Sequence, residues 1–208
     1  MRGASWIAAA MAALIAALMA GALASLAGCD KLFAPPKSSF HAIDVTGGEM
    51  GGELHLTDHN GRPRSLADFR GKAVVLFFGY THCPDVCPTT LSDLARAMRL
   101  LGADAARVQV LFVTVDPKRD TAELLRQYVP AFDPSFLGLS GDAAATAKVT
   151  KDFRVYAQER PGQSPESYTV DHSAQAFVFD PQGRVRLLMA YGSAPEAIAS
   201  DLKKLLGP

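Results

Sequence analysis

Residues 73–88 read AVVLFFGYTHCPDVCP, an apolar run that leads directly into two cysteines. The run from Ala73 to Phe78 is rich in Val and Phe and shows no polar alternation. Such a run predicts a strand buried on both faces, as in a sheet that helices cover on each side. In α/β folds ligand and redox sites lie where such strands end, so Cys83 and Cys87 occupy a candidate functional position.

The segments on both sides of this stretch alternate between helix and strand patterns. Leu54 and Leu56, followed by Asn60-Gly61, predict an N-terminal hairpin. Periodicity and caps predict helices over 89–101, 121–129, 142–152 and 195–206, and apolar runs predict strands over 108–115, 136–139, 174–179 and 184–190. This order predicts an α/β thioredoxin-like sandwich, in which a central mixed sheet with an N-terminal hairpin extension is flanked by helices.

The N-terminal segment is predicted to lie outside the folded domain. Residues 1–28 carry one basic residue, Arg2, before a long apolar run that ends in Leu-Ala-Gly, and Cys29 follows. This pattern predicts a lipoprotein signal peptide with lipid on Cys29, and an uncleaved membrane anchor is the alternative, because ~20 apolar residues suffice to cross a bilayer. Residues 29–51 are predicted to be a flexible tether rich in Pro, Ser and Gly, and 52–208 to be the folded domain.

The charge balance excludes one large class of partner. The chain has 21 basic and 21 acidic residues. Nucleic-acid binding needs a concentrated basic face, and this composition gives no case for one.

The two cysteines can form a structural disulfide, a redox pair or a metal-ligand pair. A disulfide is the usual fate of a close pair outside the cytoplasm, but a loop of five residues stabilises little. A helix through both cysteines would bring Pro88 against the carbonyl of Pro84, so the helix is predicted to begin at Pro88 with Cys87 as its N-cap. The helix dipole then favours thiolates, and the three-residue spacer favours a ligand pair.

Two soft thiolates favour Cu(I), and an added imidazole makes a site that also holds Cu(II). His172 is the predicted third ligand, because it directly precedes the strand predicted over 174–179, at a junction that faces the cysteine loop in thioredoxin-like folds. His41 lies in the tether, and His55 and His59 flank the first turn and are predicted to be exposed. His82 is predicted to point away from Cys83.

Three sequence blocks resemble the signature blocks of the Sco (SenC) family and occur in the same order. They are FGYTHCPDVCP at 78–88, VDPKRDT at 115–121 and VDHS at 170–173. The resemblance covers roughly Gly52 to the C-terminus and implies a copper-binding domain over 52–208. It implies that Cys83, Cys87 and His172 are the copper ligands, with copper as Cu(I) or Cu(II).

The resemblance also implies a role. The protein is expected to be a chaperone without enzymatic turnover, which delivers copper to the dinuclear copper site of cytochrome c oxidase. The expected partners are the copper-bearing subunit of the oxidase, a periplasmic copper donor and the membrane, with no nucleic acid. The expected location is the bacterial inner membrane, facing the periplasm.

Two other functions remain open. A thiol-disulfide oxidoreductase would reduce the recipient's cysteines through Cys83 and Cys87 alone, and a peroxiredoxin-like peroxidase is the third alternative. Near the cysteines, Asp85 is a candidate for adjusting the charge of the site or for contacting a partner. Asp171 is a candidate for accepting a hydrogen bond from His172. Asp116, which precedes a proline, is predicted to be a turn carboxylate.

Overall fold

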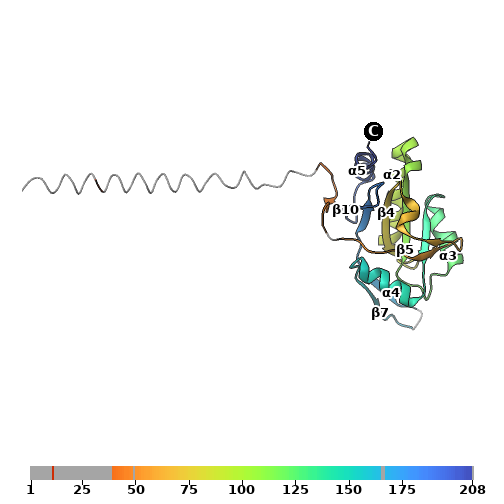
Figure 1. The fold of residues 1–208 in the computed structure, drawn as a ribbon. Coiled ribbons are helices and arrows are strands. Elements are labelled where there is room, and N and C mark those ends of the chain that lie inside the picture. Colours follow the sequence, from red (N-terminus) through yellow and green to blue (C-terminus); the bar gives the residue numbers. More distant parts are fainter. Residues whose placement is uncertain (1–10, 12–38, 49, 165–166, 208) are drawn as a thin grey trace, which may run out of the picture. The chain divides into compact units, whose positions relative to one another are not determined.

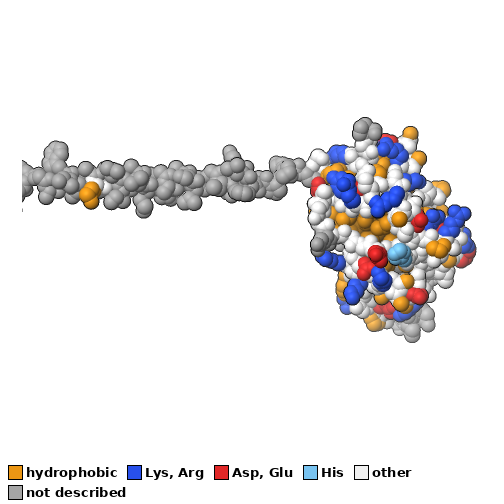
Figure 2. Space-filling model, in the orientation of Figure 1, with side chains coloured by type: hydrophobic (Ala, Val, Ile, Leu, Met, Phe, Trp, Pro, Cys, Tyr) orange, Lys and Arg blue, Asp and Glu red, His pale blue; other side chains and the backbone are white. Residues whose placement is uncertain are grey.

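The computed structural model describes residues 11, 39–48, 50–164 and 167–207, drawn as a ribbon in Figure 1 and as a space-filling view in Figure 2. The chain divides into two units, Met1–Lys37 and Ser38–Pro208, and the second contains every strand considered below. The predictions of a signal peptide over 1–28 and of lipid on Cys29 lie outside the described residues. In the described part of the chain, no helix is both long and apolar enough to cross a membrane.

A mixed sheet of eight strands forms the centre of the domain, in the order β1-β10-β9-β4-β5-β6-β2-β3. Strands β4, β5 and β6 are parallel, and the strands on either side of these three run antiparallel to them. The strands are β1 (Ile43–Asp44), β2 (Leu56–Asp58), β3 (Pro63–Arg64), β4 (Ala73–Gly79), β5 (Val108–Thr114), β6 (Leu137–Ser140), β9 (Ala176–Phe179) and β10 (Val185–Met189).

Helices cover both faces of this sheet. The helices are α2 (Val86–Leu101), α3 (Ala122–Tyr128), α4 (Ala143–Asp152) and α5 (Pro195–Leu206), with short 3₁₀ helices η2 (Leu66–Phe69), η3 (Gly102–Arg107) and η4 (Val129–Ala131). Successive residues of β4 point to opposite faces: Val75 and Phe77 pack with α2, α3 and α5, whereas Leu76 and Phe78 pack with α4. The run at 73–78 is therefore apolar throughout because both faces are core.

The predicted mixed sheet, flanking helices and N-terminal hairpin are confirmed, with two corrections. Helix α2 begins at Val86 rather than at Pro88, and Asp85 is its N-cap. Pro84 lies outside the helix, so Pro88 falls in the first turn, where a missing N–H breaks no helical hydrogen bond. The sequence also gave no sign of a separate antiparallel hairpin, β7 (Ala157–Arg160) and β8 (Thr169–His172).

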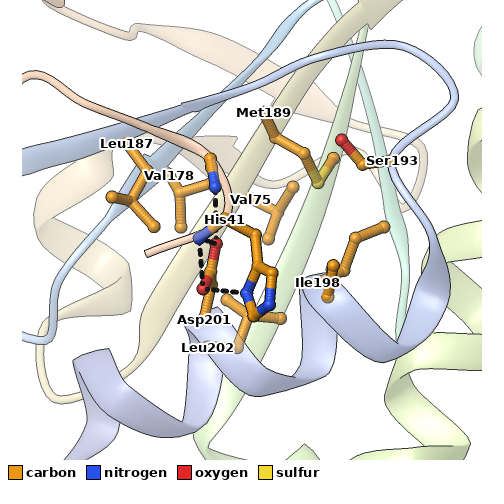
Figure 3. Close-up of a pocket in the computed structure, with 11 residues that line it drawn as sticks. His41, Val75, Val178, Leu187, Met189, Ser193, Ile198, Asp201 and Leu202 are labelled. Carbon is orange, nitrogen blue, oxygen red and sulfur yellow. Dashed lines mark hydrogen bonds and ion pairs between the residues drawn. The ribbon is translucent and has the colours of Figure 1, made fainter. Parts of the chain in front are cut away.

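The tether predicted over 29–51 is wrong for residues 39–46, which we call the strap. Its β1 pairs with β10, and the carboxylate of Asp201 accepts hydrogen bonds from the backbone N–H groups of His41 and Ala42 and from Nδ1 of His41, at 2.8–3.0 Å. Asp201 lies on the buried face of α5, with Ile198 and Leu202 next to it in Figure 3. A carboxylate there needs partners, and the strap supplies them.

Burial raises the pKa of Asp201, but the hydrogen bonds from His41 and Ala42 outweigh this effect and the net pKa is lowered. Beneath the strap, apolar side chains that include Val75, Leu187 and Met189 enclose a cavity of about 20 Å³. This volume holds about one water molecule, so the cavity is a packing gap and not a ligand site. The strap is thus fixed to the domain through a buried charge.

Candidate metal centre

The structure brings Cys83, Cys87 and His172 together at one end of the sheet. Cys83 lies in the loop after β4, Cys87 in the first turn of α2, and His172 at the end of β8. Their ligand atoms all lie within 4.8 Å of one another, and Sγ of Cys87 is 3.5 Å from Nε2 of His172. Cys87 is buried and the other two are half-buried, so Cys83 and His172 are the members of the group that solvent reaches.

Gly79, the last residue of β4, allows Cys87 to sit where it does. A Cβ atom at this position would lie 2.8 Å from Sγ of Cys87 and 2.8 Å from the ring of Phe112. Carbon atoms in good contact are about 3.5–4.0 Å apart, so no side chain fits there without displacing the sulfur or the ring. The sequence alone does not show this role of Gly79, because it depends on contacts with a helix and a neighbouring strand.

The two thiols differ strongly in acidity. A hydrogen bond from the thiol of Cys87 lowers the pKa of Cys83, burial opposes it, and backbone N–H groups of Asp85 and Cys87 and the charge of His172 add to the lowering, to about 5. The same hydrogen bond, together with burial, raises the pKa of Cys87. At neutral pH Cys83 is therefore a thiolate, and Cys87 keeps the proton that the pair shares.

The imidazole of His172 presents a free nitrogen to the cysteines. Its Nδ1 lies 2.9 Å from the carbonyl oxygen of Ser173, which can only accept a hydrogen bond, so Nδ1 carries the proton. In the neutral imidazole Nε2, which faces Cys87, therefore has its lone pair available. The rings of Phe77 and Tyr80 contact the imidazole edge-on at centroid distances of 6.3 and 5.9 Å and fix its orientation.

Two thiolate sulfurs and one imidazole nitrogen suit a soft or borderline ion such as copper or zinc. Ligands bound to one ion at ~2.0–2.3 Å lie roughly 3.5–4.5 Å apart, which is close to the spacing of these three groups. Three donors also leave a coordination position that an exchanging ligand can enter.

Asp120 holds the loop that precedes Cys83. Its buried carboxylate accepts hydrogen bonds from the backbone N–H and the hydroxyl of Thr81, at 3.0 and 2.6 Å, and from the hydroxyl of Thr114 at 2.6 Å. The loop is thereby tied to the end of β5. The sequence alone does not connect Asp120 with the cysteine loop, because 39 residues separate it from Thr81.

The side chains of the two carboxylates predicted to act near the metal hydrogen-bond other groups than the three candidate ligands. The side chain of Asp85 accepts a 3.3 Å hydrogen bond from Thr89, and it is the backbone N–H of Asp85 that bonds the sulfur of Cys83. Asp171 accepts a 2.7 Å hydrogen bond from Arg160 at the surface. It does not orient His172, because the carbonyl of Ser173 already occupies Nδ1.

His82 and His59 lie outside the group of candidate ligands. His82 does not belong to the ligand group: its Nδ1 lies 3.0 Å from the hydroxyl of Thr81. The prediction of an exposed His59 is wrong, because its ring is buried and its Nδ1 accepts a 3.0 Å hydrogen bond from the backbone N–H of Gly138. His59 therefore has a structural role at β6.

The domain resembles known proteins over nearly its whole length. The profile of the SCO1/SenC family matches residues 44–207. The chain belongs to the SCO1/SenC family. It is 41% identical over 155 residues to the protein SCO2 homolog, mitochondrial, of Bos taurus, a match that covers 74% of this chain and 58% of the bovine protein. The chain thus spans less than two thirds of the length of this curated relative.

Solved structures of the SCO1/SenC family share the fold. The copper-bound structure of Bradyrhizobium japonicum ScoI is 43% identical, has a TM-score of 0.70, and covers 75% of this chain and 99% of that one. BsSco, described as a member of the Sco family of cytochrome c oxidase assembly proteins, is 16% identical with a TM-score of 0.59, over 81% of this chain and 96% of its own, and shows the fold alone.

The second block of the SCO1/SenC resemblance, 115–121, has a larger role than sequence reasoning gave it. Asp116 is 2% exposed, and its carboxylate accepts 2.6 Å hydrogen bonds from Nε of Arg119 and from the hydroxyl of Tyr168. The prediction of a simple turn carboxylate is therefore incomplete. In the sequence, Asp116 and Arg119 are recognisable only as charged residues that follow a buried strand, and this pattern does not show that Asp116 is itself buried.

Proposed function

We propose that this protein binds copper through Cys83, Cys87 and His172 and delivers it to the dinuclear copper site of cytochrome c oxidase. The observation that carries the proposal is the convergence of two thiol sulfurs and an imidazole nitrogen within 4.8 Å. The copper-bound state described for Bradyrhizobium ScoI supports copper as the ion, and the assembly role described for the Sco family supports the oxidase as recipient.

Copper here is cargo, and the acidity of the thiols fits its capture and release. The thiolate of Cys83 is the more accessible sulfur and is ready to bind an incoming ion at neutral pH. When Cys87 binds the same ion it releases its proton, and the free Nε2 of His172 supplies the third bond. A recipient's thiolates can then enter the open position and displace these ligands one at a time.

The site of action is part of the same proposal. Residues 1–28 act as a lipoprotein signal or a membrane anchor, Cys29 carries lipid in the first case, and residues up to the strap form the tether. The domain then faces the periplasm from the bacterial inner membrane, where a copper donor loads it and the oxidase subunit unloads it. The apolar run that ends at Cys29 supports this arrangement.

The test of copper delivery has two stages. The reduced full-length protein should bind one copper ion per chain, Cys83→Ser and Cys87→Ser should each weaken binding, and a deletion strain should lose oxidase activity that the parent gene restores. Each cysteine variant should fail to restore it. A reduced protein that binds no copper, or a deletion strain with normal oxidase activity at limiting copper, contradicts the proposal.

A second candidate, a thiol-disulfide oxidoreductase, is favoured by the acidity of Cys83 next to a buried Cys87. This asymmetry suits an attacking thiolate and a resolving thiol. The two functions separate at His172, which reduction does not need. A His172→Ala protein that still restores oxidase activity in the deletion strain would favour reduction over delivery.

A further inference from the structure

The hairpin that carries His172 stands apart from the main sheet. Among the described residues, strands β7 and β8 pair with each other and with no other strand, as a separate two-stranded sheet. At the base of the hairpin the backbone N–H of Ser173 donates to the carbonyl of Tyr156, and the hydroxyl of Ser173 accepts from the N–H of Tyr156, both at 3.0 Å. The position of His172 relative to the cysteines therefore depends on what fixes the hairpin to the domain.

Three residues, Asp116, Arg119 and Tyr168, fix it, and we call them the clasp. Nε of Arg119 donates to Asp116 at 2.6 Å, and its Nη1 donates to the backbone carbonyl of Tyr168 at 2.9 Å. The guanidinium carbon lies 3.6 Å from the centroid of the Tyr168 ring. The hydroxyl of Tyr168 donates to Asp116 at 2.6 Å and closes the ring of contacts.

The clasp is buried, in contrast to a second link between the same loop and the same hairpin. The side chains of Asp116 and Arg119 are 1% and 16% exposed, whereas those of the ion pair Lys118–Glu159 are 64% and 48% exposed. Exposed ion pairs contribute little, but breaking a buried pair leaves a charge without its partner. The clasp is therefore the stronger of these two polar links, and it holds the hairpin together with the side chain of Val170, which is buried in the main core.

From the clasp, contacts lead to the imidazole. The guanidinium of Arg119 lies 5.8 Å from the centroid of the Tyr80 ring, and Tyr80 contacts the ring of His172 edge-on. The backbone of Val170, two residues before His172, hydrogen-bonds the hydroxyl of Tyr80. Tyr80 follows β4 directly, so it joins the strand that leads to the cysteines with the strand that ends in the histidine.

We infer that Arg119 and Tyr168 are positioning residues that keep His172 against the cysteines and so set the preference of the site for Cu(II) relative to Cu(I). Two thiolates satisfy Cu(I), whereas Cu(II) needs a nitrogen donor as well. When the hairpin is released from the clasp, Nε2 of His172 moves away from the site, whereas the sulfurs of Cys83 and Cys87 stay in place. The inference rests on the proposed copper site, and it adds a role for the block at 115–121.

Two variants of the full-length protein test it. Tyr168→Phe removes the hydrogen bond to Asp116 and keeps the ring under Arg119. Arg119→Lys keeps the charge, but a single ammonium group does not reproduce the fork that reaches Asp116 and the carbonyl of Tyr168 together. Lys118→Gln is the matched control: it removes the exposed ion pair with Glu159 and the ammonium group 5.9 Å from the centroid of the Tyr168 ring, and it leaves every hydrogen bond of the clasp in place.

We expect both clasp variants to bind Cu(II) about 10–100-fold more weakly, the loss typical when a group that orients a metal ligand is removed. Their thiolate-to-Cu(II) absorption should weaken, while Cu(I) affinity stays within about threefold and Lys118→Gln behaves as the parent. In the copper-free proteins, amide exchange over 169–172 should become faster in the clasp variants alone. Thermal unfolding establishes that the variants remain folded.

Two results overturn the inference. One is unchanged Cu(II) affinity in both folded clasp variants; the other is an equal loss of Cu(I) and Cu(II) with unchanged amide exchange over 169–172. If the parent itself binds no copper, the proposed function fails, and the exchange measurement on copper-free protein still decides whether the clasp holds the hairpin. The two failures are therefore distinguishable.

Discussion

Replacing Gly79 by alanine places a methyl group where the structure has no room for one. The new Cβ would lie 2.8 Å from Sγ of Cys87 and from the ring of Phe112. Phe112 is fully buried and packs against Phe77 and Tyr128, so its ring has little freedom to move. Relief of each overlap to about 3.5 Å requires a shift of roughly 0.7 Å. The sulfur in the first helical turn can move away from the new methyl group, whereas the contact with the ring is relieved only by a shift of the ring or of the strand itself.

Overpacking of this kind costs about 1–3 kcal/mol, and for a domain of this size that lowers the midpoint of thermal unfolding by roughly 2–12 °C. The displaced sulfur should also weaken copper binding and shift the thiolate-to-Cu(II) absorption band. Calorimetry on the reduced copper-free protein measures the first effect, and a copper titration followed by absorption measures the second.

Gly138→Ala is the matched control. Gly138 is a buried strand glycine whose added Cβ would meet Leu125 and Val129 at 3.1 Å, and none of its near neighbours is a cysteine. It should destabilise the domain and leave the copper spectrum unchanged. Parent-like unfolding and spectrum in Gly79→Ala would refute the packing argument, and so would an equal spectral change in Gly138→Ala.

Three further predictions concern other parts of the chain. Asp201→Asn should lower the free energy of unfolding at pH 7 by about 1–3 kcal/mol in urea titrations. The pKa of this carboxyl is lowered in the fold, so its contribution is complete above the ordinary value near 3.9 and the difference from the parent shrinks as the pH falls below about 4; a difference independent of pH contradicts this. In reduced protein, thiolate absorbance should rise with a midpoint near pH 5 from Cys83, and Cys83→Ser should abolish that step; a first midpoint above pH 8 in the parent argues against the shared proton. Mass spectrometry of membranes should find a mature chain beginning at lipidated Cys29, and an intact segment 1–28 leaves the transmembrane anchor as the remaining interpretation.

Much of the fold follows from local patterns. The strand at 73–78 is buried on both faces, so composition alone reveals it, and helix α5 shows its apolar stripe over the whole of its length. The hairpin of β7 and β8 gave no such signal, because every residue of β7 is exposed and the strand has no apolar face to create alternation. An exposed strand of this kind is recognised only from its pairing partner.

The ligand group was predictable because each member stands next to a strong local element. Cys83 and Cys87 follow a buried strand, and His172 precedes one. The hydrogen bonds that support the strap and the hairpin were not predictable, because they join distant parts of the chain. Asp201 accepts from the backbone of His41, 160 residues away, and the hydroxyl of Tyr168 donates to Asp116, 52 residues away. The sequence shows the carboxylates, and only the fold shows that they are buried and what they bind.

The affinity of the His172→Ala protein for Cu(II), measured beside its affinity for Cu(I), tests the three-ligand copper site most directly. The structure places Nε2 of His172 3.5 Å from Sγ of Cys87 with its lone pair free. We expect Cu(II) affinity to fall by at least the ~10–100-fold typical of losing an outer group, with loss or shift of the thiolate-to-Cu(II) band, while Cu(I) stays bound by the two sulfurs. Unchanged Cu(II) affinity and an unchanged spectrum would show that His172 is not a ligand.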